Sequence, residues 1–296
     1  PGFGFLSENP DFAERTTQAG LAFIGPTAAT IRLMGDKSEA KRNAIAAGVP
    51  VALGTDGPLR DFDEAIGEAE RIGYPVMLKA ASGGGGKGIR VALSVKDLKD
   101  AYDSAAAEAV ANFGDGRLYM EKYIHNPRHI EVQILGDSLG NVVHLFEREC
   151  SVQRRHQKLI EECPSAFVTP ELREKMTSAA VALAKRVGYR SAGTIEFLVD
   201  NDRNFYFCEM NTRIQVEHPV TETITGTDII KEQLRIASGE PISCADKAPF
   251  TPNGHAIEFR INAEDPDYDF RPCPGTITKF KVPGGPGVRV DTYISQ

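Results

Sequence analysis

Two apolar stretches with regularly placed polar residues, at positions 194–199 and 205–211, lie on either side of a short polar segment. Both stretches are rich in β-branched and aromatic residues, which favour strands. The Asn-Asp-Arg-Asn sequence between them, at 201–204, is typical of a turn. The pattern therefore predicts a strand, a turn and a second strand that pair as an antiparallel hairpin.

The predicted hairpin places acidic side chains opposite each other. If the turn centres between Asp202 and Arg203, Glu196 faces Glu209, at the roughly 4.5–5.5 Å spacing of directly opposed residues. Asn211, further along the same strand, points to the same face. Two facing carboxylates repel each other unless a cation or a shared proton lies between them. Because all three side chains offer oxygen ligands, the pattern favours Mg²⁺ or Mn²⁺ over zinc.

Further polar residues continue this face past the second strand. Arg213, Gln215 and Glu217 occupy every second position. If the chain stays extended, they add a fixed positive charge and a candidate base beside the metal ligands. The alternative is an ordinary exposed hairpin whose outward face is charged, but the length of the polar face favours a functional site.

Apolar periodicity and capping residues predict the other elements. Helices are expected to begin after Asn9 and Asp36, and further helices to occupy 27–35, 61–73, 94–113, 169–188 and 228–238. Strand-like runs occur at 21–24, 74–80, 89–93, 118–124, 129–135, 141–147 and 255–263. Tight turns at 272–275 and 283–287 are expected to separate further strands.

A glycine-rich loop at 82–88 separates two of these strands. Gly83, Gly85 and Gly88 match the G-x-G-x-x-G pattern, but a dinucleotide-binding loop should open a helix, and here a strand follows. A loop of this kind between two strands is typical of a flap whose backbone N–H groups face phosphates. Lys79 on the preceding strand can reach the same phosphates. The alternative is a flexible linker.

Composition and charge narrow the possible partners. The net charge of −7 argues against a general nucleic-acid coat and makes any anion site local. The segment 149–158 is the most basic part of the chain but lacks interleaved aromatic residues, so it favours a phosphate or carboxylate-like ligand. The cysteines lie far apart without a CxxC pair, which favours reduced thiols in an intracellular compartment. We expect neither a nucleic-acid nor a membrane partner.

Both ends of the chain look cut, so we expect a fragment. The chain begins at Pro1 without a methionine and ends at Gln296 just after a strand-like run. An apolar fraction of 41% is still enough to build a core.

Several longer motifs occur together, at 1–9, 32–37, 82–88, 119–122, 126–129, 153–158, 209–219 and 260–265. They closely resemble the biotin carboxylase component of biotin-dependent carboxylases such as acetyl-CoA carboxylase, a member of the ATP-grasp superfamily. The resemblance covers essentially the whole chain. It implies an α+β ATP-grasp fold, with antiparallel sheets, flanking helices and a small lid that carries the glycine flap.

The resemblance also implies domain boundaries. Residues 1–35 would be the tail of an N-terminal α/β domain. Residues 36–240 would form the ATP-grasp domain, with its lid at about 52–124. Residues 241–296 would begin an incomplete C-terminal domain.

The resemblance assigns roles by position. The residues implied for binding ATP phosphates are Lys37, Lys79, Gly84, Gly85 and Gly86. Those implied around the rest of the nucleotide are Glu121, Lys122, Ile124, His129, Gln153 and His156. Mg²⁺ or Mn²⁺ would be held by Glu196, Glu209 and Asn211, and bicarbonate would be surrounded by Lys158, Arg213, Gln215 and Val216. Glu217 would be the base, and Arg260 would stabilise the biotin enolate.

The implied activity is carboxylation of biotin on a carrier protein or domain, with ATP and bicarbonate as co-substrates and carboxyphosphate as the intermediate. The implied partners are that carrier and a carboxyltransferase subunit, together with a homodimer partner at full length, in the cytoplasm or an organelle matrix. One alternative is another ATP-grasp ligase, of the carbamoyl-phosphate or purine-synthesis kind. The other is a module that binds nucleotide without turnover.

Overall fold

The computed structural model describes residues 2–81, 88–155, 157–245 and 251–294. The chain divides into two units, Pro1–Phe259 and Arg260–Gln296. The described α-helices are α1 (Pro10–Gln18), α2 (Ala28–Gly35), α3 (Lys37–Ala46), α4 (Phe62–Ile72), α5 (Val95–Phe113), α6 (Pro170–Arg186), α7 (His218–Thr225) and α8 (Ile229–Ala237).

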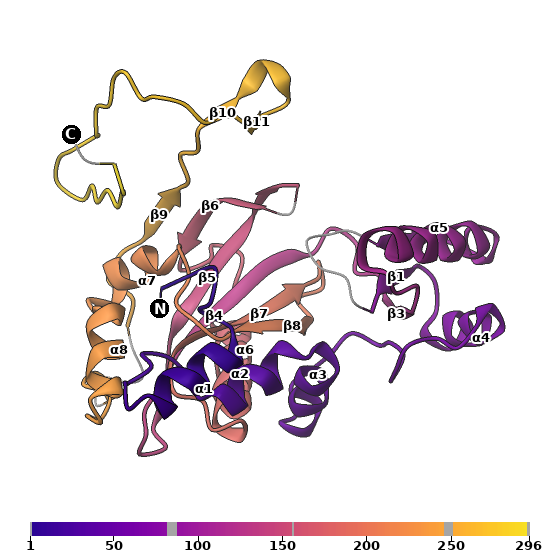
Figure 1. Ribbon diagram of the computed structural model, residues 1–296, viewed down its shortest axis with the longest axis horizontal. Coiled ribbons are helices and arrows are strands. Elements are labelled where there is room, and N and C mark those ends of the chain that lie inside the picture. Colours follow the sequence, from indigo (N-terminus) through magenta and orange to yellow (C-terminus); the bar gives the residue numbers. More distant parts are fainter. Residues whose placement is uncertain (1, 82–87, 156, 246–250, 295–296) are drawn as a thin grey trace. The chain divides into compact units, whose positions relative to one another are not determined.

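A six-stranded antiparallel sheet forms the centre of the first unit, in the order β8-β7-β4-β5-β6-β9 (Figure 1). Its strands are β4 (Arg128–Gly136), β5 (Val142–Arg154), β6 (Gln157–Cys163), β7 (Ser191–Val199), β8 (Phe205–Asn211) and β9 (Ala256–Phe259). The predicted hairpin is confirmed as β7 and β8. The basic segment, for which no strand was predicted, completes β5 and starts β6.

A β-bulge sets the register of the β7–β8 hairpin. Phe197 pairs with Phe207, whereas Glu196 pairs with Glu209, so Cys208 is an extra residue without a partner on β7. The turn is one residue shorter than predicted. Without the bulge, Glu196 would therefore lie opposite Cys208. The extra residue restores the predicted Glu196–Glu209 pair.

The two faces of the sheet differ in polarity. One face is apolar and packs against α2, α3 and α6, through a buried cluster that includes Met34, Ala40, Ile130, Val132, Met176, Leu183, Ile195 and Phe197. On β4 the buried residues Glu131 and Gln133 alternate with these apolar positions and therefore point to the opposite face. Leu135, two positions further on, packs with Ile229 and Ile236 of α8.

A smaller sheet with its own core lies within residues 52–124, the range in which a lid is expected. The antiparallel order β2-β1-β3 joins β1 (Val76–Ala80), β2 (Ile89–Ala92) and β3 (Leu118–Lys122). Helices α4 and α5 cover it through a separate cluster that includes Ala65, Ala69, Leu78, Leu98, Ala105 and Met120. The strands on either side of the glycine run are thus confirmed, whereas residues 82–87 themselves lie outside the described residues.

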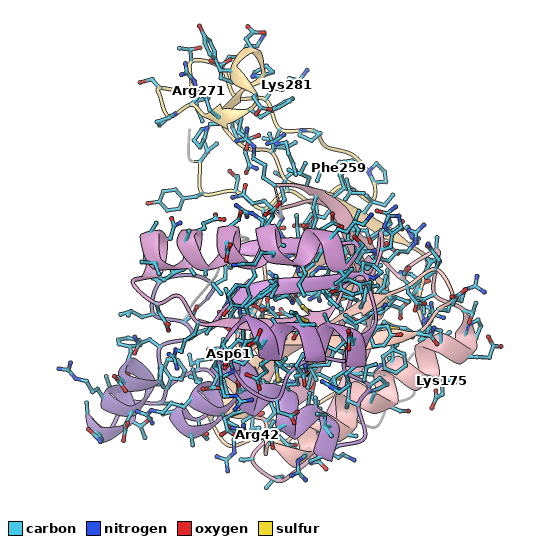
Figure 2. All side chains as sticks on the ribbon, turned by 90° about the vertical axis from the view of Figure 1, so that its right-hand side faces the viewer. Arg42, Asp61, Lys175, Phe259, Arg271 and Lys281 are labelled. Carbon is cyan, nitrogen blue, oxygen red and sulfur yellow. The ribbon has the colours of Figure 1, made fainter. Side chains whose placement is uncertain are left out.

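Local capping chemistry positions most helices as expected. At α1, α2, α3, α4, α6 and α8 a side-chain oxygen of the N-cap residue accepts from a backbone N–H of the first turn; these residues are Asn9, Thr27, Asp36, Asp61, Thr169 and Asp228. Charged side chains such as those of Arg42 and Lys175 cover the outside of the helices (Figure 2). None of the helices in the described ranges has the apolar length needed to span a bilayer.

Two strand predictions were wrong. Residues 21–24 form no strand, and Leu21 is 64% exposed, so its apolar character does not reflect burial in a sheet. In the second unit, β10 (Glu264–Asp265) pairs with β11 (Arg271–Pro272) around a 3₁₀ turn at Pro266–Tyr268. The described residues 273–294 contain no further strand and are almost all exposed, so they have no buried face to hold one.

Candidate active site

A row of charged residues crosses four neighbouring strands of the large sheet. Arg148 on β5 is paired with Glu131 on β4, Glu131 with Glu196 on β7, and Glu196 with Glu209 on β8. Directly paired residues point to the same face of a sheet, so one cation and three carboxylates share this row. Such a concentration of negative charge requires further cations.

Lys158 on β6 supplies one of these cations. Its Nζ donates to Glu131 Oε2 at 2.5 Å, to Glu217 Oε1 at 2.7 Å and to Glu196 Oε1 at 2.9 Å. Burial opposes the charge of Lys158, but the carboxylates of Glu131 and Glu196 outweigh it and raise the pKa of the ammonium group. All three donor positions of the ammonium are used. Lys158 is therefore held as a fixed positive charge.

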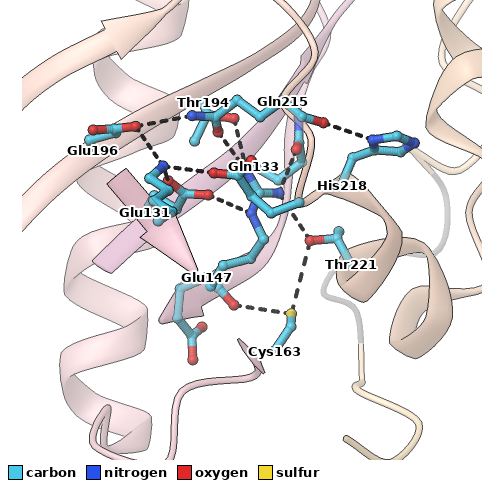
Figure 3. A network of polar contacts seen from close by, with 12 residues as sticks. Glu131, Gln133, Glu147, Cys163, Thr194, Glu196, Gln215, His218 and Thr221 are labelled. Carbon is cyan, nitrogen blue, oxygen red and sulfur yellow. Dashed lines mark hydrogen bonds and ion pairs between the residues drawn. The ribbon is translucent and has the colours of Figure 1, made fainter. Parts of the chain in front are cut away.

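Four other predicted site residues contact Glu196, which Figure 3 draws within the polar network. Besides Lys158, its Oε1 accepts from Asn211 Nδ2 at 2.8 Å and from Gln215 Nε2 at 3.0 Å. Its Oε2 lies 2.9 Å from His129 Nε2. Burial opposes ionisation of Glu196, but His129 and Lys158 lower the pKa of its carboxyl well below the usual range. Glu196 therefore stays charged.

The facing pair of Glu196 and Glu209 fits a hard cation. Glu209 is exposed, yet the surrounding protein limits hydration of its carboxyl, and this burial together with the charge of Glu196 raises its pKa. A raised pKa means that the negative charge on Glu209 is disfavoured, and a divalent cation would relieve this. With Asn211 at the end of β8, the donor set consists of oxygens, as Mg²⁺ and Mn²⁺ prefer. Glu196, Glu209 and Asn211 would hold such an ion.

The chain does not stay extended after β8, so the condition under which Arg213, Gln215 and Glu217 would continue the face of the strand is not met. β8 ends at Asn211, a loop follows, and α7 begins at His218 with Glu217 as its N-cap residue. Gln215 and Glu217 nevertheless reach the cluster from this loop, as their contacts with Glu196 and Lys158 show.

Two hydrogen bonds hold the guanidinium group of Arg213 in place. Its Nε donates to Glu8 Oε2 at 2.7 Å, and its Nη2 donates to Asn211 Oδ1 at 2.9 Å. The backbone N–H of Thr212 also donates to Glu8, at 2.9 Å. Glu8, from the segment before α1, thus anchors the loop and the guanidinium beside the predicted metal ligands.

Lys79 and Glu121, two of the predicted nucleotide residues, form a second group. Lys79 Nζ donates to Glu121 Oε2 at 2.5 Å, and Lys41 lies 3.5 Å from the other carboxylate oxygen. Burial opposes both charges, but each ionised partner favours the other, so the pKa of Lys79 is raised and that of Glu121 is lowered. Lys122 Nζ instead donates to the carbonyl oxygens of Gly73 and Tyr74.

The remaining predicted residues are spread over several segments. Lys37 opens α3 and lines a cavity of about 260 Å³ together with Glu209 and Asn211. Gln153 Nε2 donates to Cys150 O at 2.8 Å and lies 3.3 Å from His129 Nδ1. Ile124 follows β3, and Val216 precedes Glu217 in the loop before α7. Gly84, Gly85, Gly86 and His156 lie outside the described residues, and Arg260 belongs to the second unit.

Sequence reasoning missed Arg148 and Glu131, although both are fully buried at the centre of the cluster. The sequence did contain a signal for the polar face of this strand. Polar residues recur at alternate positions of the apolar run 129–135, as Glu131 and Gln133, and an alternating polar position inside a strand marks one face. The alternation along one strand does not show which other strands pair with it.

The sequence matches three known domain families, by their profiles. Residues 36–245 match "Carbamoyl-phosphate synthase L chain, ATP binding domain". Residues 1–31 match "Biotin carboxylase, N-terminal domain", and residues 258–296 match "Biotin carboxylase C-terminal domain".

Curated relatives agree with these matches. A biotin carboxylase of a Nostoc species is 55% identical over 294 residues, which is 99% of this chain and 66% of that protein. The small subunit of 2-oxoglutarate carboxylase from Hydrogenobacter thermophilus is 55% identical over 291 residues, which is 98% of this chain and 61% of that protein. The chain thus spans less than two thirds of the length of these relatives.

Solved structures share the fold. A Campylobacter jejuni biotin carboxylase complex with a β,γ-ATP compound superposes with a TM-score of 0.90 at 52% identity, covering 98% of this chain and 64% of that one. The biotin carboxylase domain dimer of Hydrogenobacter thermophilus 2-oxoglutarate carboxylase, in complex with MgADP, ADP and bicarbonate, gives 0.87 at 54% identity, covering 96% and 63%. The chain has the ATP-grasp fold and belongs to the biotin carboxylase family.

Proposed function

We propose that this chain carries the catalytic centre for ATP- and bicarbonate-dependent carboxylation of biotin on a carrier protein, by way of carboxyphosphate. The observation that carries the proposal is the Lys158 cluster. A partly buried ammonium contacts Glu217 and Glu196 simultaneously, and Glu196 faces Glu209 across the hairpin. A proton acceptor, an anion-binding cation and a candidate divalent-cation site thus meet at one place.

The residues around Lys158 suit a small oxyanion that also carries an acidic O–H group. Lys158 and Arg213 offer positive charge, and Gln215 offers an amide N–H. Glu217 offers a carboxylate oxygen 2.7 Å from Lys158 Nζ, so an anion held by the ammonium lies within reach of a base. Bicarbonate has both features, and we assign Glu217 as the group that takes its proton.

Lys79, Lys37 and the glycine flap at 84–86 are proposed to hold the phosphates of ATP. The Lys79–Glu121 ion pair puts a fixed cation on the strand that leads into the flap. The nucleotide would also be lined by Lys122, Ile124, His129, Gln153 and His156. A divalent cation held by Glu196, Glu209 and Asn211 would neutralise phosphate charge when bound.

Carboxyphosphate decomposes in water, so the site must exclude solvent while it exists. The cluster is already largely dry, since Glu196 is 5% and Glu217 2% exposed. A flap that closes over the phosphates would complete this exclusion. Arg260 is proposed to offset the negative charge that develops on the ureido oxygen of biotin.

The family relationship extends the proposal to the assembly. We propose the domain limits 1–35, 36–240 and 241–296, and as partners a carboxyltransferase subunit together with a biotin carboxyl carrier protein. Support for a homodimer comes from the dimer named for the Hydrogenobacter thermophilus relative. A cytoplasmic or organelle-matrix location is supported by relatives from bacteria and by one named as chloroplastic in Populus trichocarpa.

A second candidate is supported by the match of residues 36–245 to an ATP-binding domain of carbamoyl-phosphate synthase. Both enzymes would activate bicarbonate with ATP, but they differ in the nucleophile that accepts the carboxyl group. Ammonia in place of biotin would then stimulate turnover. A third candidate function is nucleotide binding without turnover. It predicts that the chain binds ATP but releases no ADP when bicarbonate is added.

The deciding measurement is ADP release with Mg²⁺ and ATP, in the presence and absence of bicarbonate and free biotin. It should be made on this chain and on a version extended at both ends to the length of its relatives. Release that requires both bicarbonate and biotin is the expected result. Stimulation by ammonia and not by biotin would favour the second candidate, and silence of both versions would overturn the proposal.

A further inference from the structure

Arg148 lies at the centre of the cluster, and Gln215 is the one predicted substrate position to which it donates in the described part of the chain. It is fully buried, on β5, and its guanidinium group makes five hydrogen bonds to five different residues. The acceptors are Glu131 Oε1 at 2.6 Å, Gln133 Oε1 at 2.7 Å, Gln215 Oε1 at 2.8 Å, Thr194 Oγ1 at 3.1 Å and Thr221 Oγ1 at 3.1 Å. A guanidinium group has five N–H donors, so every one is used.

These contacts come from separate segments of the chain. Glu131 and Gln133 lie on β4, and Thr194 lies on β7. Gln215 lies in the loop before α7, and Thr221 lies on α7 itself. Figure 3 shows their side chains converging. Arg148 therefore ties the loop that carries Gln215 and Glu217 to the middle of the sheet.

The contact with Gln215 fixes the direction of an amide. Because Gln215 Oε1 accepts from Arg148, its Nε2 must point away, and it donates to Glu196 Oε1 at 3.0 Å. An amide nitrogen carries two hydrogens, so Nε2 has one further N–H with which it can donate to a bound anion. With the opposite orientation, Gln215 would present a carbonyl oxygen to Glu196 and to any anion, and both contacts would be repulsive.

The contact with Glu131 acts on the other side of the cluster. Arg148 Nε takes one carboxylate oxygen of Glu131, and the other oxygen accepts from Lys158 at 2.5 Å. Lys158 is thus held by a carboxylate whose orientation Arg148 sets. Two of the groups that would meet an oxyanion, Lys158 and Gln215, are thus both oriented through one buried side chain.

We propose that Arg148 is a positioning residue that makes Gln215 a hydrogen-bond donor and fixes Lys158, so that the site selects a small oxyanion. This inference rests on the proposed function for the identity of that oxyanion, bicarbonate. A lysine cannot replace Arg148, because three donors on a flexible stem cannot fill five fixed positions.

Arg173 offers a matched control. It donates from Nε and Nη2 to the two oxygens of Glu147, at 2.8 and 2.7 Å. Glu147 is the neighbour of Arg148 on β5 and is also fully buried, but it points to the opposite face of the sheet. Arg173→Lys on α6 therefore disturbs an ion pair with the strand that carries Arg148, without touching Gln215 or Glu131.

The first test compares steady-state ADP release by Arg148→Lys and Arg173→Lys. Arg148→Lys is expected to raise the KM for bicarbonate by about tenfold or more, the effect of one charged hydrogen bond, with the KM for ATP within about twofold. Arg173→Lys should change neither. Equal shifts in both KM values, or the same bicarbonate effect in Arg173→Lys, would overturn the proposal, because a general loss of structure predicts that pattern.

The second test is a double-mutant cycle with Gln215→Met. If Arg148 acts through Gln215, this change raises the KM for bicarbonate in the unmodified chain but has little further effect in Arg148→Lys. Effects that multiply would overturn the proposal. If Arg148→Lys does not fold, Thr194→Val removes the acceptor that shares Arg148 Nη2 with Gln215, and it should give a smaller shift with the same coupling.

The third test does not depend on turnover, so it separates this inference from the proposed function. In a crystal structure of Arg148→Lys, Gln215 should leave Glu196 or reverse its amide. Retention of the Gln215–Glu196 and Lys158–Glu131 contacts would overturn the inference even if the chain carboxylates biotin. Their loss in a chain without activity would support it while the proposed function fails.

Discussion

Glu196 and Glu209 lie directly opposite each other on β7 and β8, and the unpaired Cys208 brings them into line. The hairpin therefore holds two carboxylates face to face by means of a bulge, which a regular ladder would avoid. Like charges in this arrangement destabilise a sheet. A fold that keeps them opposed is expected to gain stability from the cation that separates them.

Replacing Glu209 by glutamine should separate the repulsion between the two carboxylates from the stabilisation that a bound cation gives. Without a metal ion, Glu209→Gln removes the repulsion, and the free energy of unfolding should rise by roughly 0.5–1 kcal/mol. With Mn²⁺ present, the unmodified chain should gain stability by mass action, and the variant should gain much less. Thermal unfolding with and without Mn²⁺ measures both, with the exposed Glu70→Gln as control. Equal stabilisation of both chains by Mn²⁺ would contradict the site.

Removing the ammonium of Lys158 should be costly for folding. Lys158→Met leaves Glu131, Glu196 and Glu217 close together without the cation that they share. Loss of one partner from a buried ion pair costs about 3–5 kcal/mol. Urea unfolding at neutral pH tests this, and Lys175→Met on the outer surface of α6 is the control. A loss no larger than that of the control would show that the carboxylates do not depend on Lys158.

Local sequence signals predicted the parts of the fold that are locally determined. The cap residues Asn9 and Asp36 and the β7–β8 hairpin depend on contacts within a few residues, and such contacts can be read from the chain. The Glu196–Glu209 pair was predicted correctly, although the turn is one residue shorter than predicted and its centre is therefore displaced by half a residue. The bulge at Cys208 compensated for that error.

Arg148 could not be found in the same way. Its acceptors are separated from it by up to 73 positions, and they meet because β5, β4 and β7 are neighbours in the sheet and α7 packs against β5. A sequence without strand order gives no reason to pair an arginine with Gln133, Thr194 or Gln215. The resemblance to a family supplied the residues proposed to meet substrates, but not the buried residue that orients them.

Replacing the proposed base should abolish chemistry and spare binding. Glu217→Gln is nearly isosteric and keeps an oxygen that can accept from Lys158, so the cluster should remain intact. Loss of a general base lowers rates by about 10²–10⁴-fold. Bicarbonate-dependent ADP release should fall by this amount, while the affinity for ATP, measured by calorimetry, stays the same. Persistence of turnover would remove Glu217 from the mechanism.

Asp137 gives a prediction about pH far from the proposed chemistry. One of its oxygens accepts from the backbone N–H groups of Leu139 and Asn141, both at 2.9 Å. The other accepts from Asn141 Nδ2 at 2.8 Å and from the backbone N–H of Ile242 at 3.2 Å. Burial opposes its charge, but these hydrogen bonds outweigh burial and lower the pKa of Asp137. The folded state therefore favours the carboxylate.

Asp137→Asn should lower the free energy of unfolding by about 1–3 kcal/mol at neutral pH, because an amide nitrogen would replace the oxygen that faces Asn141 Nδ2 and Ile242 N–H. A carboxyl whose pKa is lowered by folding stabilises the protein fully above its unfolded pKa of about 3.9, and this contribution is lost as the pH falls through the folded value. The difference between the two chains should thus be constant above about pH 5 and shrink below about pH 4. Urea unfolding across this range measures the difference. A gap that stays constant at low pH would show that Asp137 does not change its pKa on folding, and that the hydrogen bonds to the turn and to Ile242 do not favour its charged form.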